Sequence, residues 1–202
     1  ALAGATKTGL TTTAETGFRV TVDQLNASLT ERTKALIFVT PSNTTAAVNP
    51  KEEIEAIGQW ALENNVWIFA DEIYEHLVYG SNVHYSLPSL VPECAHQTVI
   101  LNGVAKTYAM TGWRVGWIVA PEDVAKASST LQSHQTSNVA NISQQAALAA
   151  VSGTLDAVDE MRSAFDNRRQ VMYSMLSEID GVSVLEPQGA FYAFPNFSGC
   201  LN

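Results

Sequence analysis

Lys106 and Arg114 lie in a run of small residues and glycines, GVAKTYAMTGWRVG, at residues 103–116. A lysine directly after an apolar, strand-like stretch can be held in a confined pocket, where desolvation favours its neutral amine. Such an amine can act as a nucleophile and as a base. The forked guanidinium of Arg114 suits a phosphate group, and the neighbouring glycines let the backbone approach closely. The same residues would also fit a surface lysine and arginine beside a strand, so this run alone leaves both interpretations open.

Three more polar residues follow other strand-like stretches. Asp71 comes directly after the apolar residues 66–70, at the place where open α/β sheets bind their ligands. A carboxylate there can keep a pyridine nitrogen protonated, and Tyr74, three residues later, can offer its hydroxyl to a phenolic oxygen. Asn43 follows residues 35–40 in the same way and could donate to that oxygen. Each also has an ordinary explanation, because aspartate at a strand end often forms a cap or a turn and Pro-Ser-Asn is a turn sequence.

Four short, β-branched stretches are predicted to be strands that position these residues. Because their apolar residues are continuous, we expect the strands to be buried on both faces. Between the first two, Asn49 is expected to cap a helix that has Pro50 at its first position. Strand, helix and strand in this order predict a mostly parallel α/β sheet flanked by helices. The four stretches are residues 35–40, 66–70, 98–101 and 115–120.

The second half of the chain changes character. An amphipathic helix is predicted from about residue 155 to 179, followed by strands at residues 182–185 and 190–194. We therefore expect a partial large domain at residues 1–155, and a connecting helix with part of a smaller α+β domain at residues 156–202. The helix positions expected to be buried are Val158, Met161, Phe165, Val171, Met175 and Leu176.

Composition argues against several classes of function. A net charge of −9 argues against nucleic-acid binding, because that function needs clustered Lys and Arg. Cys94 and Cys200 are far apart, and we expect no disulfide and no metal site. Without an apolar run of roughly 20 residues or a signal-peptide pattern, the protein is expected to be cytoplasmic, with no membrane partner. The histidines have no ligand-like pattern and are expected at the surface or in packing: His76, His84, His96 and His134.

The motifs together resemble those of the class I/II aminotransferases of fold type I. Asn43, the segment Asp71-Glu-Ile-Tyr74, and Lys106 with Arg114 occur in the order and spacing of that family. The sequence around the lysine is most similar to that of bacterial aspartate aminotransferases, and the resemblance continues to the motif EPQGAFYA near the C-terminal end. The implied fold is the large domain of pyridoxal-phosphate-dependent transferases, with part of their small domain.

This resemblance implies pyridoxal 5'-phosphate as the cofactor and a role for each matching residue. Lys106 would form the Schiff base with the cofactor and move a proton between the substrate's α-carbon and the cofactor. Asp71 would pair with the ring nitrogen, while Asn43 and Tyr74 would bind the phenolic oxygen. Arg114 would bind the phosphate. The implied reaction transfers an amino group between an amino acid, aspartate or glutamate, and a 2-oxo acid, and the implied assembly is a homodimer.

The sequence departs from the family pattern in two ways. The family usually continues the Asn43 turn with Pro-Thr-Gly, whereas here the residues are Thr44-Thr45-Ala46. Without the glycine a positive φ is unfavourable, so we expect Asn43 to be less well positioned. Family members are also considerably longer. Their phosphate loop, ring-stacking aromatic residue, cross-dimer tyrosine and substrate-carboxylate arginine are expected to lie outside this chain, in which no arginine follows Arg169.

Two alternatives stand beside the aminotransferase interpretation. A carbon–sulfur lyase, or another enzyme of fold type I, would share the same cofactor anchors. A truncated, catalytically inactive fragment could instead act as a cofactor-binding or dimerisation module, and the altered turn after Asn43 favours this for the isolated chain. For the longer protein to which this sequence would belong, the enzyme is favoured, because the cofactor-binding residues are all present: Asn43, Asp71, Tyr74, Lys106 and Arg114.

Overall fold

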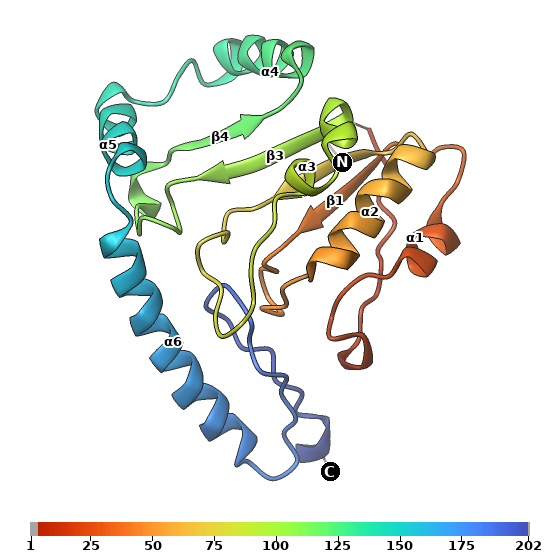
Figure 1. Cartoon of the computed structure of the whole chain (residues 1–202), viewed down its shortest axis with the longest axis vertical. Coiled ribbons are helices and arrows are strands. Elements are labelled where there is room, and N and C mark those ends of the chain that lie inside the picture. Colours follow the sequence, from red (N-terminus) through yellow and green to blue (C-terminus); the bar gives the residue numbers. More distant parts are fainter. Residues whose placement is uncertain (1–3, 202) are drawn as a thin grey trace.

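A computed structural model describes residues 4–201, which form a four-stranded sheet with helices around it (Figure 1). The strands are β1 (Ala35–Val39), β2 (Trp67–Asp71), β3 (Thr98–Gly103) and β4 (Gly116–Val119). They lie in the order β1-β2-β3-β4 across the sheet. β1, β2 and β3 are parallel, and β4 is antiparallel to β3. The mostly parallel α/β sheet predicted from the sequence is therefore confirmed.

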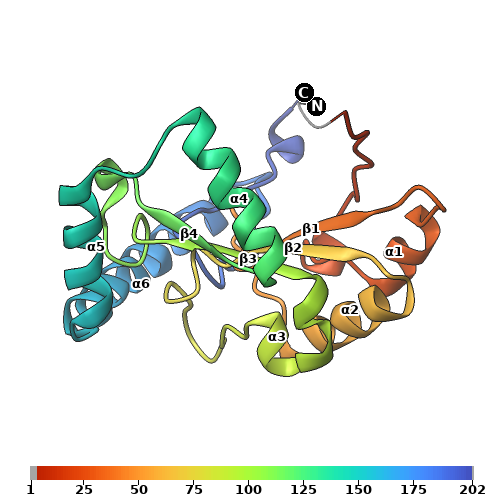
Figure 2. The ribbon, with the colours of Figure 1, turned by 90° about the horizontal axis from the view of Figure 1, so that it is seen from above.

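Helices lie on both sides of the sheet. They are α1 (Val22–Ser28), α2 (Lys51–Glu63), α3 (Leu87–Leu90), α4 (Glu122–Gln135), α5 (Asn141–Ser152) and α6 (Asp156–Ser177). Short 3-10 turns occur at Ala14–Thr16, Pro92–Gln97, Thr111–Trp113 and Ser198–Cys200. Figure 2 shows α2 and α3 on one side of the sheet and α4 on the other.

The main hydrophobic core lies between α2 and the sheet. Ile54, Ile57 and Ala61 recur at helical spacing along α2, and all three are buried. They belong to one cluster with Phe38 of β1 and Ile68 of β2. Removing this apolar surface from water is the main force that holds the helix against the strands. The core thereby fixes β1 and β2 relative to each other, along with the loops that follow them.

Asn49 does not cap α2 as predicted. The N-cap residue is Pro50, which has no side-chain acceptor, and the helix begins at Lys51. The Asn49 side chain instead donates from Nδ2 to Oε2 of Glu53 at 3.1 Å. Its backbone N–H donates to Oγ1 of Thr40 at 3.2 Å. Asn49 thus links the start of α2 to the end of β1, a tertiary role that the local pattern does not reveal.

The prediction that the strands are buried on both faces is wrong for β1 and β4, where Ile37, Trp117 and Val119 are exposed. Phe38 is 5% exposed, whereas Ile37 beside it in β1 is 75% exposed. Adjacent residues of a strand point to opposite faces, so in β1 only the face that packs against α2 is buried. α4 lies on the other side (Figure 2), but none of its residues is buried. Apolar residues show that a face avoids water, but they do not show which element covers it.

α6 confirms the predicted long helix, and its first half packs as expected. Val158 is buried. Met161 and Phe165 pack against Tyr74 and Leu77, which are both fully buried in the loop after β2. This small second cluster holds α6 against the loop between β2 and β3.

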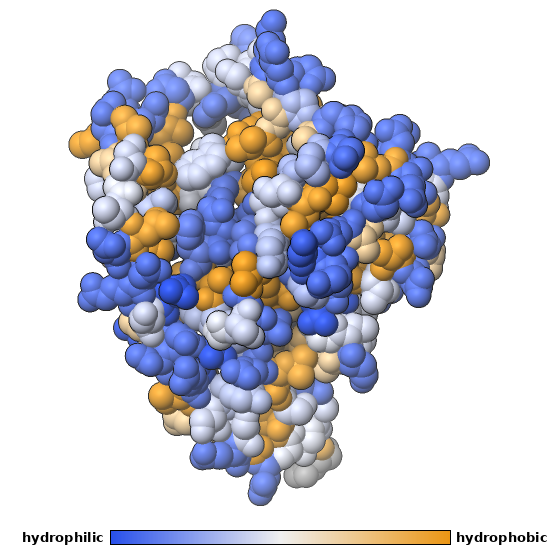
Figure 3. All heavy atoms as spheres, viewed as in Figure 1, coloured by the Kyte–Doolittle hydropathy of each residue, from blue (hydrophilic) through white to orange (hydrophobic). Residues whose placement is uncertain are grey.

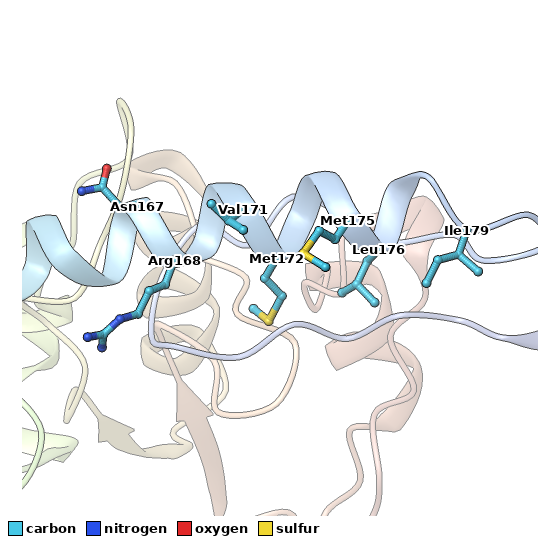
Figure 4. Close-up of a pocket in the computed structure, with 7 residues that line it drawn as sticks. All are labelled: Asn167, Arg168, Val171, Met172, Met175, Leu176 and Ile179. Atoms are coloured by element: carbon cyan, nitrogen blue, oxygen red, sulfur yellow. The ribbon is translucent and has the colours of Figure 1, made fainter.

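The second half of α6 departs from the prediction. Val171 and Met175 are 60% and 64% exposed, because this half extends along the edge of the molecule away from the sheet (Figure 1). Figure 3 shows apolar side chains among polar ones on this side of the molecule. The exposed half of α6 lines an open apolar groove (Figure 4). Its lining residues are Asn167, Arg168, Val171, Met172, Met175, Leu176 and Ile179.

The segment after α6 does not form the two strands predicted there. In the part of the chain that the structure describes, its pairing is limited to isolated bridges, one of which joins Gly189 to Val78. Its backbone groups bond to loops instead, as where the Ala190 N–H donates to the Leu77 carbonyl at 2.8 Å. Residues 182–185 and 190–194 therefore form no regular strands, because the backbone groups that they bond to belong to irregular loops.

Candidate active site

Asn43, Asp71 and Lys106 all lie at or beyond the carboxyl end of a parallel strand. The strand register places Val39 and Asp71, the last residues of β1 and β2, beside Leu101, two residues before the end of β3. Neighbouring strands lie about 4.8 Å apart, so the loops that follow them meet at one edge of the sheet. Open α/β sheets bind their ligands at this edge.

Asn43 and Tyr74 are in direct contact at this edge. Nδ2 of Asn43 donates to the Tyr74 hydroxyl at 3.3 Å. Tyr74 is fully buried. Burial raises the pKa of Tyr74 above its ordinary value, and the negative charge of Asp71 acts in the same direction. Tyr74 therefore keeps its proton at neutral pH and can donate a hydrogen bond to a ligand.

The loop that carries Asn43 adopts left-handed backbone conformations without the glycine of the family. Thr44 and Ala46 have φ values of 108° and 58°. The Ala46 carbonyl accepts hydrogen bonds from the backbone N–H groups of Gln188 at 3.0 Å and Gly189 at 2.9 Å. Each bond contributes about 1 kcal/mol, which offsets a left-handed alanine's strain of about 1–2 kcal/mol. The altered turn still lets the Asn43 amide reach the Tyr74 hydroxyl, and the expectation that Asn43 is less well positioned than in the family stays a prediction.

Asp71 is both a turn former and a free acceptor. Its Oδ1 accepts a hydrogen bond from the backbone N–H of Ile73 at 3.2 Å, which shapes the turn after β2. Its Oδ2 makes no hydrogen bond with the described residues. Its charge helps to raise the pKa of Tyr74, three residues later in the chain. Asp71 can therefore present one carboxylate oxygen to a ligand while the other maintains the turn.

Lys106 reaches the same cluster from the loop after β3. Its Nζ lies 5.9 Å from the ring centroid of Tyr74 and 5.5 Å from that of Phe191, within the range of cation–π contacts. Gly103 allows this placement, because a Cβ there would lie 2.7 Å from the carbonyl oxygen of Val115. The absence of a side chain lets β3 and β4 approach closely just before the lysine.

Arg114 is not brought into this cluster. It is exposed, has a left-handed backbone with φ 55°, and donates from Nη1 to the carbonyl of Thr111 at 2.9 Å. Within residues 4–201, no hydrogen bond or ion pair joins it to Asn43, Tyr74 or Lys106. The other four residues predicted for the site lie together, whereas the Arg114 side chain folds back on its own loop.

Two aromatic residues complete the cluster, and the sequence did not single them out. The hydroxyl of Tyr192 lies 2.6 Å from that of Tyr74. The Phe191 ring meets the Tyr74 ring edge-on, with 5.5 Å between centroids. The available signal was an aromatic pair shortly after a glycine. Gly189 allows the segment to approach closely, because a Cβ there would lie 2.7 Å from Cβ of Pro41.

A second polar cluster lies beside Asp71 and includes His84, which the sequence placed at the surface or in packing without a partner. Its Nε2 is 3.3 Å from Oε2 of Glu72, and the two side chains are only 9% and 4% exposed. Ser86 donates to the other oxygen of Glu72 at 2.9 Å, and Asn102 donates to Glu75 at 2.7 Å. Ligand atoms of Glu72, Glu75 and His84 lie within 4.8 Å of one another, but both carboxylates already accept hydrogen bonds. The cluster joins the loop after β2 to β3.

Sequence comparison assigns the chain to a family. The family model for class I and II aminotransferases matches residues 1–200. The chain belongs to the class I and II aminotransferase family. An aspartate aminotransferase of Streptomyces avermitilis is 58% identical over 200 residues, which cover 99% of this chain and 49% of that protein. An aspartate aminotransferase of Geobacillus stearothermophilus is 48% identical over 179 residues, which cover 89% of this chain and 46% of that protein.

Solved structures of aminotransferases show the same fold. The aspartate aminotransferase of Rhizobium meliloti superposes with a TM-score of 0.91 at 36% identity, over 94% of this chain and 48% of that chain. An aromatic aminotransferase of Pyrococcus horikoshii gives a TM-score of 0.89 at 37% identity, over 92% of this chain and 50% of that chain. This family member spans about half the length of the curated relatives it matches. In residues 4–201, no helix combines the length and apolar character needed to cross a membrane.

Proposed function

We propose that the protein is a pyridoxal-phosphate-dependent aminotransferase that transfers an amino group between aspartate or glutamate and a 2-oxo acid. The observation that carries this proposal is the convergence of Asn43, Asp71, Tyr74 and Lys106 at the carboxyl edge of the sheet. Two similar proteins are named aspartate aminotransferases, and one from Streptococcus mutans, 41% identical, is named an asparagine–oxo-acid transaminase. These names support a small amino acid of the aspartate type as the donor.

The side chains present fit this cofactor. Pyridoxal phosphate offers a ring nitrogen, a phenolic oxygen, an aldehyde and a phosphate, and when bound it supplies an electron sink for charge at the substrate's α-carbon. Asn43 and Tyr74 bring two hydrogen-bond donors to one point, Asp71 has an uncommitted carboxylate oxygen, and Lys106 supplies an amine. Thr107, beside the lysine, is 1% exposed, and its hydroxyl has no hydrogen-bond partner among the described residues. Its hydroxyl is therefore also available to a bound group.

Each residue has a defined task in this proposal. Lys106 would hold the cofactor through its amine and, once released from it, would move a proton at the substrate's α-carbon. The Asp71 carboxylate holds a proton on the ring nitrogen, and Asn43 and Tyr74 donate to the phenolic oxygen. Arg114 binds the phosphate, which requires its guanidinium to leave the Thr111 carbonyl.

The division of the chain and its assembly are part of the same proposal. Residues 1–155 form the cofactor-binding unit, and residues 156–202 form the connecting helix and part of the smaller domain, with α6 beginning at Asp156. We propose a cytoplasmic homodimer. The free thiols of Cys94 and Cys200 suit a reducing compartment, and the exposed Ile37 lies on a sheet face that further packing would cover.

The proposal predicts that the chain binds pyridoxal phosphate through Lys106. Adding the cofactor should give an absorbance band near the edge of the visible range. Lys106→Ala should abolish this band, whereas Lys126→Ala, on the exposed surface of α4, should leave it unchanged. A wild-type chain without the band would contradict the cofactor assignment. Amino transfer from aspartate to 2-oxoglutarate then tests the reaction.

A second candidate function is a cofactor-binding or dimerisation module without turnover. It is favoured by the exposed position of Arg114 outside the cluster. A chain that binds the cofactor through Lys106 but transfers no amino group from aspartate would support this candidate. Measurable transfer that Lys106→Ala abolishes would rule it out.

A further inference from the structure

The Tyr74 hydroxyl takes part in two hydrogen bonds within the protein. Asn43 donates to it from Nδ2 at 3.3 Å, and the Tyr192 hydroxyl shares a hydrogen bond with it at 2.6 Å. A tyrosine hydroxyl has one proton to donate and two lone pairs that accept. Asn43 uses one lone pair. The direction of the bond with Tyr192 therefore decides whether the Tyr74 proton is free for a ligand or already used.

We propose that Tyr192 is a positioning residue that donates its proton to Tyr74 and leaves the Tyr74 proton free for the cofactor's phenolic oxygen. This inference rests on the proposed function, in which Tyr74 donates to that oxygen. In the opposite arrangement, Tyr74 would donate to Tyr192 and would have no proton to offer. Tyr192 would then compete with the cofactor instead of supporting its binding.

The difference in burial between the two tyrosines supports this direction. Tyr74 is fully buried, so its hydroxyl must be satisfied by the protein or a bound ligand; if its single proton goes to the cofactor, its oxygen can only accept the bond that it shares with Tyr192. Donation by Asn43 and Tyr192 satisfies both lone pairs of that oxygen. Tyr192 is only half-buried, and water can reach it to satisfy its own oxygen. A hydroxyl that accepts hydrogen bonds also becomes a stronger donor, so the arrangement strengthens the bond that Tyr74 makes to a ligand.

Tertiary contacts on both sides of Tyr192 hold it in place. Phe191 stacks on Phe165 of α6, with 5.4 Å between ring centroids and 27° between ring planes. The Ala190 carbonyl accepts a hydrogen bond from the Tyr79 hydroxyl. The Tyr192 hydroxyl therefore belongs to a segment anchored both to α6 and to the loop after β2, which allows it to fix the orientation of its partner.

The sign of a spectroscopic shift tests the direction of the hydrogen bond. With pyridoxal phosphate bound to the full chain, the pH midpoint of the cofactor's absorbance change is measured for wild type and Tyr192→Phe. Loss of the donor weakens Tyr74 as a donor to the phenolic oxygen, so the midpoint should rise by about 0.5 pH unit. A fall would show that Tyr74 had been donating to Tyr192 and would overturn the proposal. An unchanged midpoint would overturn it as well.

A second variant shows whether Tyr192 acts through Tyr74. In a Tyr74→Phe background, Tyr192→Phe should cause no further shift of the midpoint, because the intermediary hydroxyl is absent. A shift that persists would mean that Tyr192 acts on the cofactor directly, contrary to the proposal. Tyr173→Phe, on α6 and outside the cluster, is the matched control and should leave the midpoint at its wild-type value.

The tyrosine pair can also be tested without cofactor. If the wild-type chain gives no cofactor band, the proposed function fails for this chain while the pair remains testable by urea unfolding. Tyr74→Phe and Tyr192→Phe remove the same hydrogen bond, so the double variant should be little less stable than the more affected single variant. Such coupling supports the pair, whereas fully additive losses would overturn the proposal.

Discussion

Arg169 ties α6 to the segment that completes the candidate site, and its replacement should loosen that segment. Its Nε donates to Asp166 at 2.7 Å, and its Nη1 donates to Glu186 at 2.6 Å and to the Pro187 carbonyl at 3.1 Å. The guanidinium lies 5.4 Å from the ring centroid of Tyr79, and the side chain is 10% exposed. Burial opposes the charge, but bonds to Glu186 and Asp166 raise the pKa of Arg169, so it stays charged.

Arg169→Met keeps an unbranched stem and removes the cation. The ion pair with Asp166 within the helix accounts for about 0.5 kcal/mol of stability. The pair with Glu186, which is 57% exposed, accounts for no more than about 1 kcal/mol because water screens it. The bond to the Pro187 carbonyl and the contact with the Tyr79 ring add about 1 kcal/mol each at most. We expect the free energy of unfolding to fall by about 2–3 kcal/mol in total.

Urea unfolding followed by circular dichroism measures this loss, and Arg162→Met is the matched control. Arg162 also pairs with an aspartate three residues earlier on α6, Asp159 at 3.2 Å, but it is more exposed and has no bond to the C-terminal segment. Its replacement should lower the free energy of unfolding by less than about 0.5 kcal/mol. Equal losses for Arg169→Met and Arg162→Met would refute the conclusion that the tertiary bonds stabilise the segment.

Two further predictions concern the backbone around the site and use urea unfolding. Ala46→Gly should change the free energy of unfolding by no more than about 0.5 kcal/mol, because relief of left-handed strain offsets the lost methyl burial and the added chain entropy. Ala56→Gly, on the exposed side of α2, should lower it by about 1 kcal/mol, and a larger loss at Ala46 would contradict this account. Gly103→Ala should destabilise the protein by about 1–3 kcal/mol, since its Cβ would lie 2.7 Å from the Val115 carbonyl oxygen. Gly112→Ala, whose Cβ would meet no atom within 4 Å, should be neutral, and similar stabilities for these two variants would show that the close strand contact is unimportant.

The sequence by itself determined the sheet and most of the candidate site. Short β-branched runs predicted all four strands within one or two residues, because strand formation depends on residues that are close together in the chain. Strand, helix and strand in succession predicted parallel pairing, which brings the ends of consecutive strands to one edge. Asn43, Asp71 and Lys106 therefore converge for a reason that can be inferred before the structure is known.

The tertiary structure alone decided which surfaces are covered and which side chains complete the site. Ile37 is as apolar as a core residue but remains exposed, because burial depends on what packs against a residue and not only on its chemistry. Ala46 keeps a left-handed backbone because Gln188 and Gly189 bond to its carbonyl. Tyr192 reaches a partner 118 residues earlier in the chain. Contacts between segments so far apart leave no periodic pattern in the sequence, because they depend on how the loops pack after the local elements have formed.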